Sequence, residues 1–134
     1  MIFFQNYPFL IPLISVFCAE LIKVSIESVR KKHWSIKNFL HSGGMPSGHS
    51  SLSGGILYTS FHISGIQSVE FSIATVLAIV VMYDAINLRR QAGKHARVLN
   101  TLQKKEKLDE RLGHTFMEML MGFILGIGVA IVLL

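Results

Sequence analysis

The chain has 134 residues, of which 51% are hydrophobic and 16% charged, and its mean hydropathy is +0.49. This length suffices for one domain and excludes two, and the composition is too apolar for an ordinary soluble domain. The net charge of +5 does not indicate nucleic acid, because the basic residues flank apolar segments as they do in membrane proteins. Cys18 is the single cysteine, so no disulfide forms within the chain. The sequence predicts one membrane domain over residues 1–134.

Four apolar segments are predicted to cross a bilayer, which makes the expected fold an all-α integral membrane helix bundle. A helix needs roughly 20 apolar residues to span the hydrocarbon core. The first segment is apolar up to Cys18 and charged beyond it, whereas the second contains Gly54, Gly55 and several hydroxyl groups. That second segment is predicted as a span because its neighbours require one. The four spans are expected at about 3–29, 51–66, 71–88 and 115–134.

Two polar connectors, about 30–47 and 89–114, carry almost all of the basic residues. Of the 13 lysines and arginines, four lie in the first connector and eight in the second. By the positive-inside rule, both connectors are expected on the cytoplasmic side of the cell membrane and both chain termini outside. The first connector contains His33, Trp34 and Phe39, which predict either an interfacial amphipathic helix or a plain basic loop.

Charged side chains inside the predicted spans need partners, because an ionised group at the bilayer centre costs roughly 2.5–3.5 kcal/mol. Glu20, Lys23 and Glu27 share one helical face at three- and four-residue spacing. That face is either an internal ion pair or part of a functional site. His114 and Glu118 also lie four residues apart, at the cytoplasmic mouth of the last span. A histidine with an in-register carboxylate at that place favours catalysis over a purely structural role.

Glycines on the last span predict close contacts between helices. Gly122 and Gly126 continue the face of His114 and Glu118, so a neighbouring helix is expected to pack closely there. Together with Gly128 they also offer a face through which a homodimer would form.

The segment 42–51, Ser-Gly-Gly-Met-Pro-Ser-Gly-His-Ser-Ser, combines the features of a phosphate-binding turn. Pro46 fixes a turn, and the glycines around it let backbone amides approach an anion closely. The helix expected next would direct its N-terminal amides and positive dipole end at the same place. His49 adds a group that titrates near neutrality and can donate a proton. A simple helix-capping turn is the alternative, but the second histidine, His114, at the same membrane face favours a phosphate-handling site.

The Pro-Ser-Gly-His string at 46–49 resembles the second signature of the type 2 phosphatidic acid phosphatase superfamily, which includes the vanadium haloperoxidases. The third signature ends in His, three residues and Asp, and His114 with Glu118 is similar to it except for the Glu. That signature also has an arginine six residues before its His, where this chain has Leu108. The chain therefore lacks the arginine that normally holds phosphate.

The first signature of the superfamily is Lys, six residues, then Arg-Pro; Lys23 and Arg30 match it, but Lys31 replaces the proline. The chain is more similar to the divergent, YuiD-like branch of the superfamily. In that branch Arg89, with Arg90 or Lys94, would supply the missing charge, and Arg111 is an alternative. The matching blocks are Gly43–His49, Met82–Ala85, Arg89 with Ala92–Lys94, Leu99–Asn100 and Leu112–Thr115.

The resemblance implies hydrolysis of a phosphomonoester through a phosphohistidine. His114 would attack phosphorus, and Glu118 or Asp84 would orient and stabilise its imidazole. The alternative role of Asp84 is to neutralise Arg89 or Lys94. His49 would protonate the leaving alkoxide and later activate water. The groups expected to hold the phosphate are Lys23, Arg30, Ser47, Gly48, Arg89, Arg90 and Lys94.

No cysteine–histidine cluster has zinc spacing and the carboxylates are scattered, so the sequence predicts no metal and no other cofactor. A site at a membrane mouth favours a lipid phosphate as substrate, such as phosphatidate, phosphatidylglycerol phosphate or a prenyl phosphate. Substrate and membrane lipids are therefore the expected partners.

Two alternatives stay open. The first is a catalytically inactive membrane protein that binds lipid phosphate, which the missing arginine and the low span count favour. The second is a small transporter or channel subunit, which leaves the Pro-Ser-Gly-His string unexplained. Its ion path would use Glu20, Lys23, Asp84 and Glu118.

Overall fold

The computed structural model describes residues 2–31, 44–102, 107–110 and 112–134, with the side chains of residues 2, 30 and 31 excepted. Within these ranges every regular element is a helix, as predicted for an all-α fold. The expected interfacial segment around Trp34 lies outside the described residues. The elements are α1 Ile2–Asn6, α2 Leu10–Lys31, α3 Gly48–Ser64, α4 Val69–Tyr83, the π-helical turn η2 Asp84–Leu88, α5 Arg89–Leu102 and α6 Phe116–Leu133.

Short polar residues begin three of the long helices, because their side-chain oxygens accept hydrogen bonds from the first free amides. Ser47 caps α3, Ser68 caps α4 and Thr115 caps α6. Gly65, with a φ of 81°, ends α3 in a conformation that favours glycine. The turn between α3 and α4 is therefore encoded locally.

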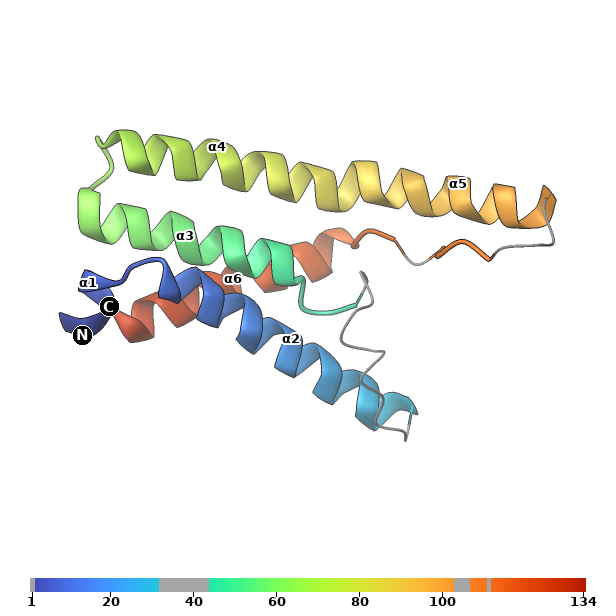
Figure 1. Ribbon diagram of the computed structural model, residues 1–134, viewed down its shortest axis with the longest axis horizontal. Helices are drawn as coiled ribbons and strands as arrows, with labels where there is room; N and C mark the ends of the chain where they lie inside the picture. The colour runs from blue at the N-terminus through green and yellow to red at the C-terminus, as the bar shows by residue number, and fades with distance from the viewer. Residues whose placement is uncertain (1, 32–43, 103–106, 111) are drawn as a thin grey trace.

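Helix α3 lies at the centre of the bundle and packs against α2, α4 and α6, while α2 also contacts α6 (Figure 1). Six of the nine buried apolar residues in the described chain are alanines, and the buried positions of α3 are glycine, serine and threonine. Large apolar side chains such as Ile79, Ile124 and Val132 are exposed. Small residues inside and large apolar residues outside are typical of helices that pack within a lipid bilayer.

The close contact predicted for Gly122 and Gly126 is confirmed, and the neighbouring helix is α3. A Cβ atom at Gly122 would collide with the Ser47 carbonyl oxygen, and one at Gly126 with that of Ser51. Helix α3 of the same chain thus fills the space beside two of the three glycines, and the homodimer expected through this face stays a prediction. Among the described residues outside its own helix backbone, no atom lies within 4 Å of a Cβ atom built on Gly128.

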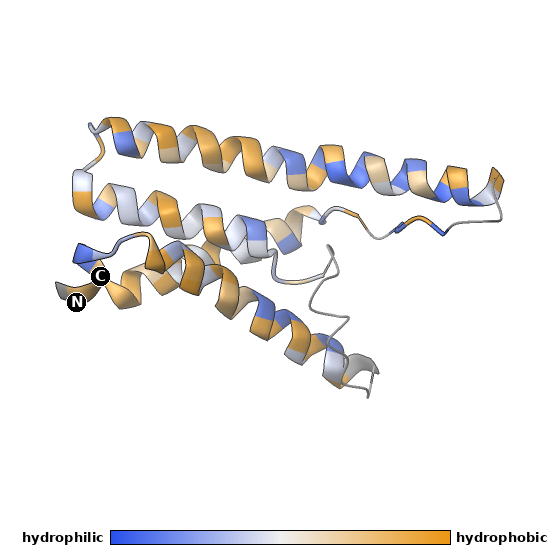
Figure 2. Ribbon diagram, in the orientation of Figure 1, coloured by the Kyte–Doolittle hydropathy of each residue, from blue (hydrophilic) through white to orange (hydrophobic). Residues whose placement is uncertain are grey.

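Within the described part of the chain, two helices are long and apolar enough to cross a membrane by length and composition: the continuous helix Val69–Leu102 and α6. Figure 2 shows the change from apolar to hydrophilic residues where α4 passes into α5. The connector expected at 89–114 thus begins as a helix that continues the span. Helix α3 has 17 residues and α2 contains five charged residues, so the spans expected on them stay predictions.

Both chain termini and the turn between α3 and α4 lie at one end of the bundle (Figure 1). The start of α3, the end of α2 and the whole of α5 lie toward the other end. The turn between α3 and α4 has no lysine or arginine, whereas α5 has four, and the side of a membrane that each end faces stays a prediction. This arrangement brings the two sequence motifs with histidines to one end of the fold.

Candidate functional site

The Pro-Ser-Gly-His turn is held by the start of α3 and by α6. The Ser47 hydroxyl accepts a hydrogen bond from the Ser50 amide at 3.4 Å and another from the Ser50 hydroxyl at 3.1 Å. The Ser47 amide donates to the Glu118 carbonyl oxygen at 3.1 Å. Both serine side chains are fully buried. Ser47 therefore acts as a helix cap and also ties the turn to the first turn of α6.

His114 lies just before α6 and is 4% exposed. Its backbone amide donates to the Ala85 carbonyl oxygen at 2.9 Å, which fixes it against η2. Its Nδ1 atom is buried without a hydrogen-bond partner. Burial lowers the pKa of His114 below the ordinary histidine value, and the Glu118 carboxylate opposes this shift. A hydrogen bond with the Gly44 backbone also raises that pKa. Burial therefore favours the neutral form of this imidazole.

Glu118 has two roles in this geometry. Its carboxylate accepts a hydrogen bond from the Thr115 amide at 2.8 Å, while the Thr115 hydroxyl accepts one from the Glu118 amide at 3.3 Å. This reciprocal pair is a capping box. The same carboxylate oxygen lies 3.7 Å from His114 Nδ1. Glu118 thus starts the last helix and places negative charge beside the buried imidazole.

His49 lies in the first turn of α3, two residues before the span predicted at 51–66, and is exposed. Partial loss of hydration lowers its pKa, and the Arg89 charge lowers it further, whereas Asp84 and Glu20 raise it. His114 interacts electrostatically with His49 as well. The two histidines therefore belong to one electrostatic cluster although they are 65 positions apart.

Two ion pairs lie beside the histidines. Lys23, which is 4% exposed, contacts the Glu20 carboxylate at 2.6 Å. Arg89 Nε contacts the Asp84 carboxylate, also at 2.6 Å. The second pair spans η2, whose wider turn is a frequent feature of functional sites. Both cations thus have carboxylate partners next to the place where a phosphate would bind.

The structure brings most of the predicted site residues together: His114, His49, Glu118, Asp84, Lys23, Ser47, Gly48 and Arg89. It does not bring in Arg90 and Lys94, which are exposed on α5. Neither the side chain of Arg30 nor Arg111 is among the described residues.

Glu20 belongs to the cluster but was not among the predicted site residues. A Cβ atom at Gly48 would lie 2.6 Å from Glu20 Oε1, so this carboxylate packs against the start of α3. In the sequence, the three-residue spacing between Glu20 and Lys23 indicated an ion pair, but nothing indicated that Glu20 would lie near His49. Among the described residues, no group of three His, Cys, Asp or Glu side chains is arranged to hold a metal ion.

The apolar helices and this cluster define a small all-helical membrane protein with a polar site at one end of its bundle. The chain belongs to the divergent PAP2 family, whose family model matches residues 4–129. It is 33% identical to the uncharacterized membrane protein YuiD of Bacillus subtilis (strain 168), over 96% of this chain and 94% of that protein. No solved structure matches the chain. The family resemblance predicted from the motif blocks is therefore confirmed.

Proposed function

We propose that this protein is a membrane lipid-phosphate phosphatase that hydrolyses a phosphomonoester through a phosphohistidine, without a metal ion. The observation that carries this proposal is the burial of the His114 imidazole, which lowers its pKa, beside His49 and the start of α3. A neutral imidazole is nucleophilic, and a helix N-terminus attracts phosphate. Membership of the divergent PAP2 family supports the same reaction class.

In the proposed reaction, Glu118 stabilises the His114 tautomer that carries its proton on Nδ1, because that atom lies 3.7 Å from the carboxylate. Because Nδ1 has no hydrogen-bond partner, the bond to the Gly44 backbone is made by Nε2, and substrate binding must first displace it. The lone pair then exposed on Nε2 attacks phosphorus, and the bond from phosphorus to the alkoxide oxygen breaks. His49 donates its proton to that oxygen. Water then attacks the phosphohistidine, His49 takes the proton of the water, and inorganic phosphate leaves.

The phosphate would be held by the first amides of α3, beginning at Gly48, and by Lys23 and Arg89. Each cation must then share its charge between the phosphate and its own carboxylate. A bound phosphate dianion would also raise the pKa of His49, so that the imidazole carries the proton needed for the leaving group. Arg30, Arg90 and Lys94 are proposed to contribute longer-range positive charge.

The proposed substrate is a lipid phosphate whose head group reaches the cytoplasmic face. The site lies at the end of an apolar bundle, where a head group would meet it while the acyl or prenyl chain stays in the membrane. The basic residues at this end support a cytoplasmic position. A reporter fused after Leu134 should then give a non-cytoplasmic signal, and a cytoplasmic signal would reverse this orientation.

The test is phosphate release by protein purified in detergent, assayed on phosphatidate, phosphatidylglycerol phosphate and a prenyl phosphate. We expect vanadate-sensitive release on at least one of them. His114→Ala and His49→Ala should each lower the rate by about a hundredfold or more. His62→Ala is the matched control, since His62 is an exposed histidine at the far end of α3. No release by the wild type, or full activity of His114→Ala, would contradict the proposal.

A lipid-phosphate-binding protein without catalysis is the second candidate. The observation that favours it is the neutralisation of Lys23 by Glu20 and of Arg89 by Asp84. Such a protein would bind vesicles that contain phosphatidate, and Lys23→Ala would weaken this binding while no phosphate is released. A transporter, the third reading, would give flux in proteoliposomes that survives His49→Ala.

A further inference from the structure

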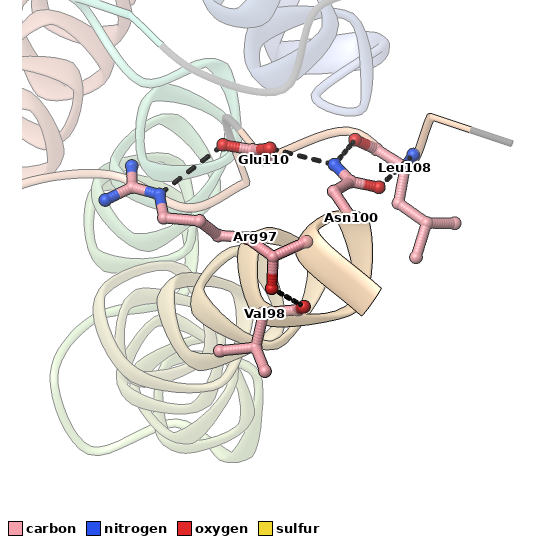
Figure 3. A network of polar contacts seen from close by, with 6 residues as sticks. Arg97, Val98, Asn100, Leu108 and Glu110 are labelled. Atoms are coloured by element: carbon pink, nitrogen blue, oxygen red, sulfur yellow. Dashed lines mark hydrogen bonds and ion pairs between the residues drawn. The ribbon is translucent and has the colours of Figure 1, made fainter. Parts of the chain in front are cut away.

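A polar clamp joins the end of α5 to the segment that leads into His114 (Figure 3). The Asn100 side-chain amide donates from Nδ2 to the Leu108 carbonyl oxygen at 2.9 Å and accepts on Oδ1 from the Leu108 amide, also at 2.9 Å. Nδ2 further donates to the Glu110 carboxylate at 2.8 Å. The side-chain amide of Asn100 thus makes two reciprocal hydrogen bonds with the Leu108 backbone, like the pair of bonds between two peptide groups in a sheet.

Arg97 completes the clamp from one turn earlier on α5. Its Nε atom lies 3.4 Å from the other carboxylate oxygen of Glu110. The Glu110 carboxylate is therefore shared by two side chains of the same helix, as the dashed lines in Figure 3 show. Both donors lower the pKa of Glu110, the Asn100 hydrogen bond most. The carboxylate stays ionised and the clamp intact at neutral pH.

Between the clamp and His114, the segment stays in contact with one face of the helix formed by η2 and α5. A Cβ atom at Gly93 would meet the carbonyl oxygens of Glu110 and Leu112, and one at Gly113 would meet the Arg90 backbone. The His114 amide then bonds to the Ala85 carbonyl oxygen. The helix positions used are 85, 90, 93, 97 and 100, which lie on one face.

This geometry fixes the register of the segment on the helix. Residues 107–110 and 112 have no helical or strand structure of their own, so contacts with α5 such as these help to fix their backbone. Close approach at Gly93 and at Gly113, where φ is 87°, is sterically allowed only where a residue has no Cβ. A shift by one residue would break the Asn100 pair and the hydrogen bond from the His114 amide to the Ala85 carbonyl oxygen, and so would move the imidazole.

We propose that Asn100, together with Glu110, is a positioning residue that sets His114 in the site. The proposal rests on the hydrolase function above, and its structural part is tested separately from activity. A displacement of about 1 Å in a reacting group costs up to about a hundredfold in rate. Loss of the clamp should therefore lower kcat more than it raises KM.

The first test compares Asn100→Ala with Thr101→Ala in the full-length protein in detergent. Thr101 is the matched control because its hydroxyl donates only to Val98 of the same helix, at 2.6 Å. For Asn100→Ala we expect kcat to fall about 10- to 100-fold, with KM changed less than about threefold. Hydrogen exchange at the Leu108 and His114 amides should become faster, and Thr101→Ala should leave both readouts unchanged.

The second test is rescue, which a general loss of folding would not permit. Asn100→Asp removes the amide donor and places a second carboxylate beside Glu110. The double variant Asn100→Asp/Glu110→Gln restores one amide–carboxylate hydrogen bond in the reverse direction. It should recover most of the activity and of the amide protection lost in Asn100→Asp.

The outcomes separate the two proposals. If the wild type releases no phosphate, the hydrolase function fails, while slower exchange at His114 in the wild type than in Asn100→Ala still supports the clamp. If Asn100→Ala keeps the wild-type exchange rate at His114, the clamp is overturned whatever the activity. If exchange rises but kcat does not fall in an active enzyme, the positioning role is overturned.

Discussion

Two regions of the molecule hold the candidate site in opposite ways. In the contact between α3 and α6, Gly122 and Gly126 let two helix backbones touch, and the polar groups are buried serines. In the arm formed by α5 and residues 107–110 and 112–114, the hydrogen-bonded side chains are exposed or half-buried. The first region is held by packing and the second by polar contacts at the surface. The comparison shows that His49 is fixed by the bundle, whereas His114 depends on both regions.

The largest expected effect is on the packed region. Gly126→Ala places a methyl group against the Ser51 backbone and should destabilise the protein by about 1–3 kcal/mol. Gly128→Ala adds the same group where no atom lies within 4 Å, so it should leave stability nearly unchanged. Thermal unfolding in detergent measures both. Equal melting temperatures for the two variants would show that the helices are not in backbone contact.

The next effect separates the two roles of Glu118. Glutamine at this position retains a side-chain oxygen for the capping box, whereas alanine does not. Glu118→Gln should lower phosphate release about tenfold or more with little change in melting temperature, because only the charge beside His114 is lost. Glu118→Ala should lower both. Full activity of Glu118→Gln would remove the carboxylate from the mechanism.

The pH dependence of stability tests the burial of His114. Its pKa is lowered by burial, so below the ordinary histidine value of about 6.5 the unfolded chain binds more protons than the folded one. Its contribution to stability is therefore complete above that value and is lost as the pH falls toward the lowered pKa. The melting temperature should fall from pH 7 to pH 5, and less steeply for His114→Gln. An identical slope for both would mean that the imidazole is hydrated.

The pH dependence of activity follows from His114 and His49. The kcat/KM value should rise with pH as His114 loses its proton and fall again as His49 loses the proton that it donates, which gives a bell-shaped profile. Glu118→Gln removes the charge that raises the pKa of His114, so the rising limb should move to lower pH. A pH–rate profile of both proteins checks the shift. A rising limb that moves to higher pH would contradict the electrostatic role of Glu118.

The smallest effect on stability and activity is expected from loss of the exposed ion pair between Arg97 and Glu110. Arg97 is 74% exposed and lies 3.4 Å from Glu110, and surface ion pairs contribute little to stability. Arg97→Ala should leave the melting temperature unchanged and lower activity by less than about twofold. A loss as large as that of Asn100→Ala would make the ion pair, and not the amide, the main contact of the clamp.

Local signals in the sequence predicted the helices and most of the site. Apolar runs predicted the long helices, and the Pro-Ser-Gly-His string predicted the turn that Ser47 caps. The four-residue spacing predicted that Glu118 would lie beside His114. These features depend on neighbours in the chain, so hydropathy and helical period suffice to find them. The family resemblance followed from the same motifs.

Only the tertiary structure decided which distant residues meet. Spacing linked Glu20 to Lys23, but packing of α2 against α3 brought that carboxylate to Gly48 and His49. Proximity favours Arg89 in place of the missing arginine of the family pattern, because among the described arginines it is the one whose charge acts on His49, whereas Arg90 is exposed.

The contact between Asn100 and Leu108 likewise has no signal in either segment alone. Helical period and hydropathy report the environment of each residue along its own helix, whereas these contacts depend on how close two backbones come. The sequence by itself thus determined the helices, the turn and the pairing of His114 with Glu118. The tertiary structure decided which residues of different helices are in contact. Glycines at the helix contacts set the distance between two backbones, and no local sequence pattern predicts that distance.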